Sequence, residues 1–141
     1  MTDSSATPRA VFEHLHRLVQ QYDMDGQADL FAPDGIMEFP FAAPGMPRFL
    51  HGRDEIRRVL VPAGRKAQQA GRRITHYDPV VVHETADPEV IVAEFTLHGE
   101  VTATGQTYQL PFIQVLRVRS GEIVSFRDYW SPQAMPTALV E

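Results

Sequence analysis

The sequence predicts an α+β fold in which amphipathic helices cover one face of a curved sheet. In the first half of the chain, apolar residues recur at three- and four-residue intervals, which is typical of helices packed on one side. From residue 74 onward, β-branched and aromatic runs alternate with short connectors that carry glycine, proline or aspartate. Four consecutive strands with short connections indicate an antiparallel meander.

The first helix is expected over residues 8–22. Thr7 is a suitable N-cap, and Pro8 suits the first helical position because its nitrogen has no hydrogen to leave unpaired. Residues 1–7 are expected to form a disordered leader and residues 8–141 a single domain. Of His14 and His16, one is expected to be solvated and the other to lie at the edge of the apolar stripe. That stripe consists of Val11, Phe12, Leu15, Leu18, Val19 and Tyr22.

The middle of the chain is expected to hold two further helices and one early strand. A short helix over 27–32 precedes a turn at 33–35, and a strand over 36–41 follows, in which Pro40 marks the end or an edge. The next loop carries two prolines and a glycine, so it is a candidate pocket rim. A third helix spans about 52–70, with a break suggested by Pro62 and Gly64.

The four later strands are expected over 74–84, 90–101, 108–119 and 122–130. Alternation in the third of them turns one apolar register inward and makes Gln114 a polar group inside it. The second has two apolar registers, so Glu94 and His98 face either solvent or a cavity shared with Asp128. The residues alone favour solvent. The inward register of the third strand is Tyr108, Leu110, Phe112, Leu116 and Val118.

The last strand presents a carboxylate among large apolar groups. Alternation places Val124, Phe126, Asp128 and Trp130 on one face. An ionised carboxylate in such company must find a donor, shift its pKa upward or lie in a cleft, and a raised pKa suits a general acid or base near neutral pH. An equally weighted alternative is that Asp128 caps the chain end or pairs with an arginine.

Composition and motifs narrow the function classes. The net charge of −5 argues against nucleic-acid and anionic-membrane partners, and the absence of cysteine excludes disulfides and thiolate chemistry. No apolar run has the length of a membrane span, and a cytoplasmic location is expected. The chain has no phosphate-binding glycine loop, no GxSxG and no HExxH, and its six histidines have no recognised ligand spacing. Neither a metal nor a cofactor is therefore expected.

Four segments together resemble the nuclear transport factor 2-like superfamily, in its SnoaL-like and ketosteroid-isomerase-related branch. They are LFAPDGIMEFPF, HGRDEI, DPEVIVAEFTLHGEV and GEIVSFRDYW, and they span nearly the whole chain. The resemblance implies a cone-shaped barrel, in which a strongly curved, mainly antiparallel sheet wraps around three N-terminal helices. It also implies an apolar cavity open at one end and a homodimer formed through the sheet.

The resemblance also suggests roles for individual residues. The second half is similar to the phenazine-biosynthesis A/B proteins: Glu94, His98 and Gly99 match their pattern, and Asp128 stands where they carry an acidic catalytic residue. Val59 stands where their helix-borne histidine is expected. Phe39 and Leu15 replace the aspartate and the tyrosine expected of a ketosteroid isomerase, which disfavours steroid isomerisation by that arrangement.

The predicted function is a cofactor-independent acid/base enzyme of isomerase, cyclase or dehydratase type, acting on a small apolar carbonyl compound. Asp128 is the predicted catalytic residue, with Glu94, His98 or His76 as its partner. The alternatives are a non-catalytic small-molecule-binding or dimeric interaction domain and, more weakly, an epoxide hydrolase. The predicted cavity residues are Tyr22, Phe39, Leu110, Phe112, Gln114, Phe126 and Trp130.

Overall fold

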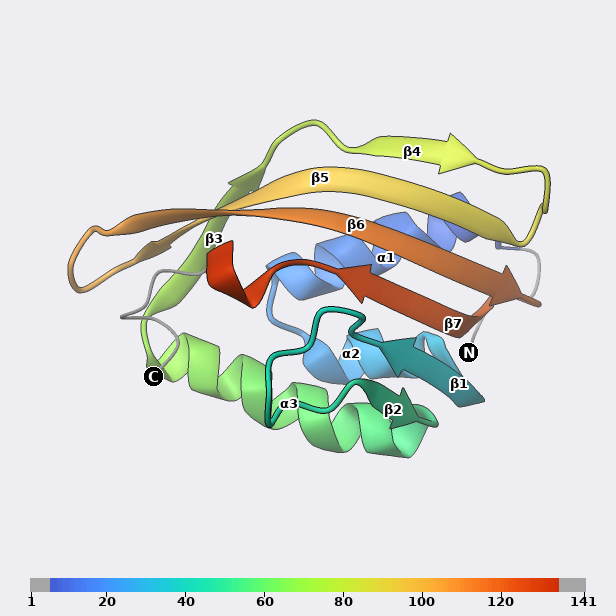
Figure 1. Ribbon diagram of the computed structural model, residues 1–141, viewed down its shortest axis with the longest axis horizontal. Helices are drawn as coiled ribbons and strands as arrows, with labels where there is room; N and C mark the ends of the chain where they lie inside the picture. The colour runs from blue at the N-terminus through green and yellow to red at the C-terminus, as the bar shows by residue number, and fades with distance from the viewer. Residues whose placement is uncertain (1–5, 135–141) are drawn as a thin grey trace.

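The computed structural model describes residues 6–134, and in it a curved sheet lies over three helices (Figure 1). Of the predicted disordered leader, residues 1–5 lie outside the described residues, but Ala6 packs against the core and Thr7 caps α1, so the leader does not extend to residue 7. The elements are α1 (Pro8–Gln20), α2 (Met24–Asp29), β1 (Phe31–Glu38), β2 (Phe49–His51), α3 (Arg53–Gln69), β3 (Arg72–Tyr77), β4 (Val81–Glu84), β5 (Val90–Val101), β6 (Thr107–Arg119), β7 (Glu122–Tyr129) and a 3-10 turn, η1 (Pro132–Ala134).

The strands form one sheet in the order β2-β1-β7-β6-β5-β3, and β4 also pairs with β5. Every neighbouring pair is antiparallel except β1 and β7, which run parallel. Figure 1 shows the sheet curling over the helices without closing on itself. The predicted α+β fold with a mainly antiparallel, strongly curved sheet is therefore confirmed.

Helix α1 forms as its sequence predicts. The Thr7 side chain accepts a hydrogen bond from the Ala10 backbone N–H at 3.1 Å, which satisfies one of the otherwise unpaired donors at the helix start. The apolar stripe faces the sheet, with Val11, Phe12 and Leu15 buried. The helix ends at Gln20 rather than Tyr22, whose φ of 58° is incompatible with a continued helix.

The break predicted in the third helix is wrong, because α3 is continuous through Pro62. An interior proline removes one backbone hydrogen bond and costs about 3 kcal/mol. Packing on both sides of the residue offsets that cost: Ile56 is fully buried, and Gly64 lies so close to Met24 of α2 that a Cβ atom there would meet its Cγ at 2.5 Å. Gly64 thus serves close packing of α2 and α3 rather than a helix stop.

Four other features differ from the prediction: the bounds of the second helix, the start of β1, the division of residues 74–84 and the presence of β2. The second helix is Met24–Asp29, capped by the Asp23 carboxylate on the Gly26 N–H, and β1 begins directly afterwards at Phe31. Residues 74–84 form two strands instead of one, since β3 and β4 both pair with β5. The three-residue strand β2 was not predicted, because so short an edge strand has no readable periodicity.

A bulge in β7 changes which residues share the face of Asp128. Arg117 pairs with Ser125 but Val118 pairs with Ile123, so Val124 is the extra residue. Ile123 is consequently buried in the core, whereas the prediction put Val124 there. Phe126 and Asp128 keep their predicted inward orientation because they follow the bulge. The β6–β7 turn itself is as predicted: Ser120 and Gly121 have φ of 54° and 76°, which suits a two-residue hairpin.

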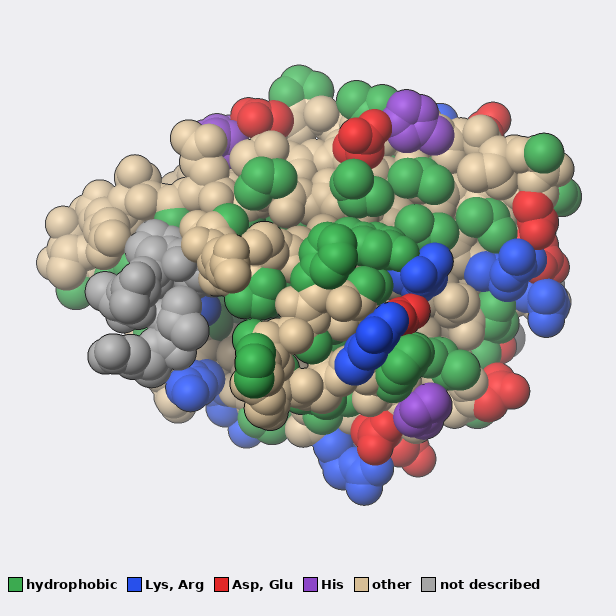
Figure 2. Space-filling model, in the orientation of Figure 1, with side chains coloured by type: hydrophobic (Ala, Val, Ile, Leu, Met, Phe, Trp, Pro, Cys, Tyr) green, Lys and Arg blue, Asp and Glu red, His purple; other side chains and the backbone are tan. Residues whose placement is uncertain are grey.

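The outer face of the sheet carries exposed apolar side chains between charged ones. Figure 2 shows hydrophobic side chains gathered over β6 and β7, and Phe41 and Ile113 are 60% and 44% exposed. A homodimer formed through this face stays a prediction. Within residues 6–134, no helix combines the length and the apolar character needed to cross a membrane.

Phe126 was predicted to line the cavity but belongs to the main core, where it is 1% exposed and packs on Phe31. Phe126→Ala is therefore expected to lower the free energy of unfolding by about 3–5 kcal/mol, since it leaves a void that rigid neighbours cannot fill. Phe41→Ala, at an exposed aromatic, should cost about 1 kcal/mol or less. Urea denaturation measures both, and equal losses would contradict the core assignment.

Candidate functional site

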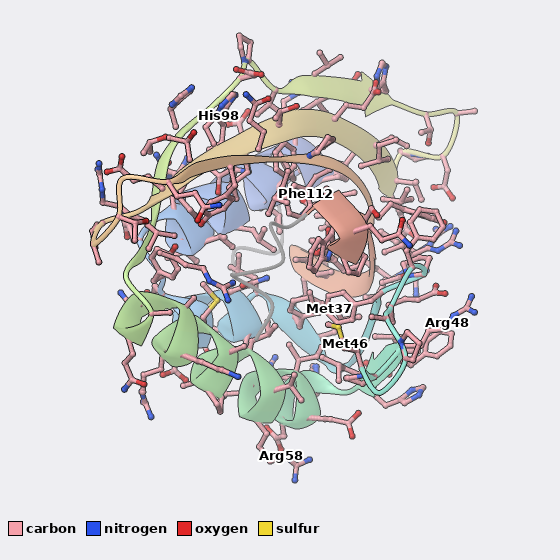
Figure 3. All side chains as sticks on the ribbon, turned by 60° about the vertical axis from the view of Figure 1, so that its left-hand side comes forward. Met37, Met46, Arg48, Arg58, His98 and Phe112 are labelled. Carbon is pink, nitrogen blue, oxygen red and sulfur yellow. The ribbon has the colours of Figure 1, made fainter. Side chains whose placement is uncertain are left out.

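A cavity of about 360 Å³ lies between the inner face of the sheet and helices α1 and α3. In Figure 3, Phe112, Met37 and Met46 point toward this hollow, whereas Arg48, Arg58 and His98 point outward. The wall is mainly apolar and includes exposed Met46 and Pro47 from the loop that was predicted as a rim. The polar side chains of the wall are His16, Gln27, Tyr77, Gln114 and Asp128.

Asp128 is held in this cavity by strand register. It lies directly opposite Gln114 in the β6–β7 pair, both side chains are buried, and the Gln114 Nε2 donates to Oδ1 of Asp128 at 3.1 Å. Burial disfavours the charged form and raises the pKa of Asp128 to about 7, although the hydrogen bond from Gln114 opposes part of that shift. A carboxyl group with this pKa exchanges protons readily near neutral pH.

The neighbouring carboxylate of Glu38 shows why Asp128 is unusual. Both are only 8% exposed, but Glu38 accepts hydrogen bonds from Arg127 at 3.1 Å and from Arg48 at 3.1 and 3.3 Å. Arg127 is adjacent to Asp128 in sequence, yet alternation sends it to the opposite face of β7. No arginine or lysine among the described residues lines the cavity. The arginine-paired alternative for Asp128 therefore does not apply, and the ion pair belongs to Glu38.

The amide of Gln114 can follow the protonation state of Asp128. Its Nε2 donates to the carboxylate, and its Oε1 is buried without a hydrogen-bond partner among the described residues. A half-turn of the amide would place Oε1 toward Asp128, where it can accept the hydrogen of the neutral carboxyl group. In both arrangements one amide atom stays free, and a substrate that offers the complementary group would remove the cost of leaving it unpaired.

His16 is a second titratable group in the cavity wall. Its ring lies against Tyr77 and Phe95, with centroids 3.8 and 4.8 Å away, and its Nε2 is buried without a partner within the described chain. Burial lowers the pKa of His16 to about 4, so the imidazole is neutral at pH 7. It was predicted only as an edge or solvated residue. The available signal was its spacing of four from Phe12, which places both on one helix face.

The predicted cavity residues divide into two groups. Tyr22 and Phe126 lie elsewhere: the Tyr22 hydroxyl donates to the Arg72 backbone oxygen at 3.1 Å, and Phe126 is a core residue. Several other residues of the cavity wall were not predicted, because they lie on elements other than the strands whose alternation was used. They include Met37, Val59, Leu60 and Phe95. The predicted residues found in the wall are Phe39, Leu110, Phe112, Gln114 and Trp130.

The predicted partners of Asp128 do not meet it. Glu94 is exposed on the outer face of β5 and pairs with His83 at 2.6 Å. His98 pairs with Asp78 at 2.9 Å. The ring of His76 stacks on the ring of His98, with centroids 4.2 Å apart. None of the three lines the cavity. Even-numbered residues of β5, which include Glu94 and His98, face away from the helices, and His76 of β3 stacks on His98. The structure instead brings His16 and Gln114 into the wall that contains Asp128.

The buried carboxyl group predicts an unusual pH dependence of stability. Because the folded pKa of Asp128 is raised from 3.8 to about 7, its contribution is greatest below pH 4 and is lost as the pH rises to 7. The loss is roughly 4 kcal/mol at most, from about 1.4 kcal/mol per pKa unit. Asp128→Asn should therefore gain stability relative to the unmodified chain as the pH rises from 4 to 8, measured by urea denaturation. Glu84→Gln, at an exposed carboxylate, should show no such trend; a constant difference for Asp128→Asn would contradict the pKa assignment.

Comparisons with known proteins agree with this architecture. The chain is 34% identical over 126 residues to an uncharacterized PhzA/B-like protein of Pseudomonas aeruginosa, covering 88% of this chain and 84% of that one. A crystal structure of a putative isomerase from Bacillus subtilis matches with a TM-score of 0.76 and 27% identity, over 88% and 86% of the two chains. A putative polyketide cyclase from Pseudomonas putida shares the fold, with a TM-score of 0.70 at 21% identity over 92% and 96% of the chains.

The family comparison covers most of the chain. The SnoaL-like domain family matches residues 12–126, which extend from the middle of α1 to the fifth residue of β7. The chain therefore belongs to the SnoaL-like domain family of the nuclear transport factor 2-like superfamily, whose neighbours include proteins named as isomerases and polyketide cyclases.

Proposed function

We propose that this protein is a cofactor-independent acid/base enzyme of isomerase or cyclase type that acts on a small apolar carbonyl compound bound in the cavity. One observation carries the proposal: the Asp128 carboxyl group is buried in an apolar cavity whose described lining residues include no lysine or arginine, and its pKa is raised to about 7. A purely structural role would favour a pairing like that of Glu38, where arginines stabilise the charge.

In the proposed reaction, the ionised Asp128 removes a proton from the carbon next to the substrate's carbonyl group. The C–H electron pair moves toward the carbonyl, so negative charge develops on its oxygen, and Asp128 becomes a neutral acid. Return of the proton to another carbon completes an isomerisation. In a cyclisation, the enolate carbon attacks a second carbonyl group, whose π electron pair moves onto its oxygen, and Asp128 then gives its proton to that alkoxide. Gln114 stabilises Asp128 in both states by turning its amide.

His16 supplies the polar contact that the developing oxyanion needs. A neutral imidazole keeps one N–H donor, and the Nε2 of His16 has no partner within the described chain. In a cavity with few polar groups, one hydrogen bond to developing charge is worth more than in water. His16 therefore takes the role of orienting and stabilising the carbonyl oxygen, and no charged partner for Asp128 is required.

The binding-domain alternative rests on the apolar character of the same wall, because a ligand-binding protein needs no proton-transfer group. Two titratable side chains with shifted pKa values, Asp128 and His16, line this one cavity, which favours the enzyme. Epoxide hydrolysis is disfavoured, because it calls for a second carboxylate and an arginine around one water, and the described wall residues include neither.

Proton abstraction can be tested without knowing the natural substrate. In deuterium oxide, the protein should accelerate deuterium incorporation next to the carbonyl of at least one member of a panel of cyclic and aromatic ketones, followed by mass spectrometry. Asp128→Asn should lower that rate by about 100-fold or more, since general acid/base groups contribute that much. Ketone binding, seen by tryptophan fluorescence, with no exchange would favour the binding domain, and Glu84→Gln is the matched control.

The exchange rate should also follow the ionisation of Asp128. Only the carboxylate can accept a proton, so the rate of the bound complex should rise with pH through about 7 and then level off. Asp128→Glu, which keeps an acid but moves it by one methylene, should retain a pH-dependent rate at a reduced level. A rate independent of pH between 5 and 9 would show that another group moves the proton.

His16→Phe keeps an aromatic ring against Tyr77 and Phe95 but removes the buried Nε2, which has no partner among the described residues. It should lower kcat by about 100-fold with a small change in KM, as loss of one oxyanion donor does. His14→Phe, at the exposed histidine two residues earlier on α1, is the control and should leave the rate unchanged. Equal effects of the two variants would assign His16 a packing role only.

A further inference from the structure

A second cluster of chemistry-bearing side chains lies on the opposite side of the sheet from the cavity. It consists of His76 in β3, Asp78 just after β3 and His98 in β5, and their nitrogen and carboxylate oxygen atoms all lie within 4.8 Å of one another. The Nε2 of His98 is 2.9 Å from Oδ1 of Asp78. Figure 3 shows His98 pointing away from the hollow, so this cluster is independent of the proposed reaction.

Backbone pairing fixes the cluster. His76 and His98 are register partners in the antiparallel β3–β5 pair, and their rings stack with centroids 4.2 Å apart and 9° between planes. The Asp78 N–H donates to the Thr96 oxygen at 3.0 Å, which places its side chain beside the next outward residue of β5. Thr75 donates to the His98 backbone oxygen at 3.0 Å, and its hydroxyl lies 3.1 Å from Nδ1 of His76.

We propose that His76, Asp78 and His98 bind one divalent transition-metal ion of the zinc type. Two imidazoles and one carboxylate are ligands that Zn²⁺ prefers, and three protein ligands leave a fourth tetrahedral position for water or another ligand. Two ligand atoms that share a zinc ion at about 2.0–2.1 Å lie about 3.3 Å apart, close to the distance between Asp78 and His98. His76 is exposed, so its ring can turn to complete the site without disturbing the core.

The electrostatics of the cluster also fit a cation. Two stacked histidines repel each other when both are protonated, whereas one metal ion uses the lone pairs of both neutral rings. Asp78 offsets part of the ion's charge. Thr75 lies where it can orient His76 through the ring nitrogen next to its hydroxyl, which is the outer hydrogen bond that metal-binding histidines usually make.

The same sheet offers a matched control. His83 of β4 and Glu94 of β5 form a second exposed histidine–carboxylate pair, 2.6 Å apart. Within the described residues, it is not part of any group of three candidate ligands, whereas His76, Asp78 and His98 are. Removing His83 changes the histidine content and the charge of the same surface but leaves the proposed site complete.

The test is titration of the protein with Zn²⁺ by calorimetry, using a chain without a histidine tag. One ion per chain is expected, with an affinity that falls as the pH drops below the range where histidine is neutral. His98→Ala and His76→Ala should each weaken binding by at least about tenfold, because even outer-shell partners of a metal site carry 10–100-fold effects. His83→Ala should bind as the unmodified chain does. Co²⁺ gives a second readout, since its absorption bands report the coordination geometry.

Circular dichroism of each variant establishes that the fold is retained, and Asp78→Asn removes the negative charge with almost no change in shape. A loss of affinity in His76→Ala, His98→Ala and Asp78→Asn together, with His83→Ala unaffected, would establish the site. Equal weakening in His83→Ala would show diffuse binding to surface histidines and overturn the proposal. No saturable Zn²⁺ binding at millimolar concentration would overturn it as well.

Discussion

The carboxyl group of Asp128 is the constraint on which the rest of the cavity depends. A buried carboxylate normally acquires a cation or several donors, and Glu38 on the neighbouring strand does so through Arg48 and Arg127. Within residues 6–134, Asp128 has one side-chain hydrogen-bond donor, Gln114, so its charged form remains costly. Pleat alternation enforces this difference, because it directs Arg127 outward and Asp128 inward from adjacent positions of β7.

Asp128 and His16 line one cavity, but their contributions to folding stability change in opposite directions with pH. Burial raises the pKa of the acid to about 7 and lowers that of the base to about 4, so both groups are driven toward their neutral forms. As the pH falls from 7 to 4, protonation of Asp128 stabilises the folded chain. Over the same range His16 is protonated more readily in the unfolded chain than in the folded one, which destabilises the folded chain. The two contributions partly cancel. The cavity can therefore hold two groups with shifted pKa values without a steep change of folding stability with pH.

Sequence reasoning reached those features that depend on local pattern. Gln114 and the inward face of β6 followed from alternation, and Asp128 followed from being polar in an apolar register. It failed for features that are determined by contacts between segments distant in the sequence. The bulge that exchanges Val124 for Ile123 depends on pairing with β6. Helix α3 continues through Pro62, and Ile56 and Gly64 on either side of it are packed against the rest of the fold. Glu94, His98 and His76 carried plausible chemistry, but strand register turns Glu94 and His98 of β5 to the outside, and His76 of β3 pairs with His98 there. His16 came from a helix whose cavity-facing side one sequence cannot identify.

The parallel contact between β1 and β7 has a consequence for how the molecule is made. β7 is the last strand of the described residues, yet it sits between β1 and β6 and carries Asp128. During synthesis, β1, β2 and the helices emerge early and must wait with an unsatisfied sheet edge until β7 leaves the ribosome. The unpaired edge of β1 is prone to aggregation until β7 pairs with it. Because β1 and β7 are far apart in the sequence, their pairing is expected to be slow. The eight residues of β7 thus carry the catalytic candidate and also join the early strand β1 to the rest of the sheet.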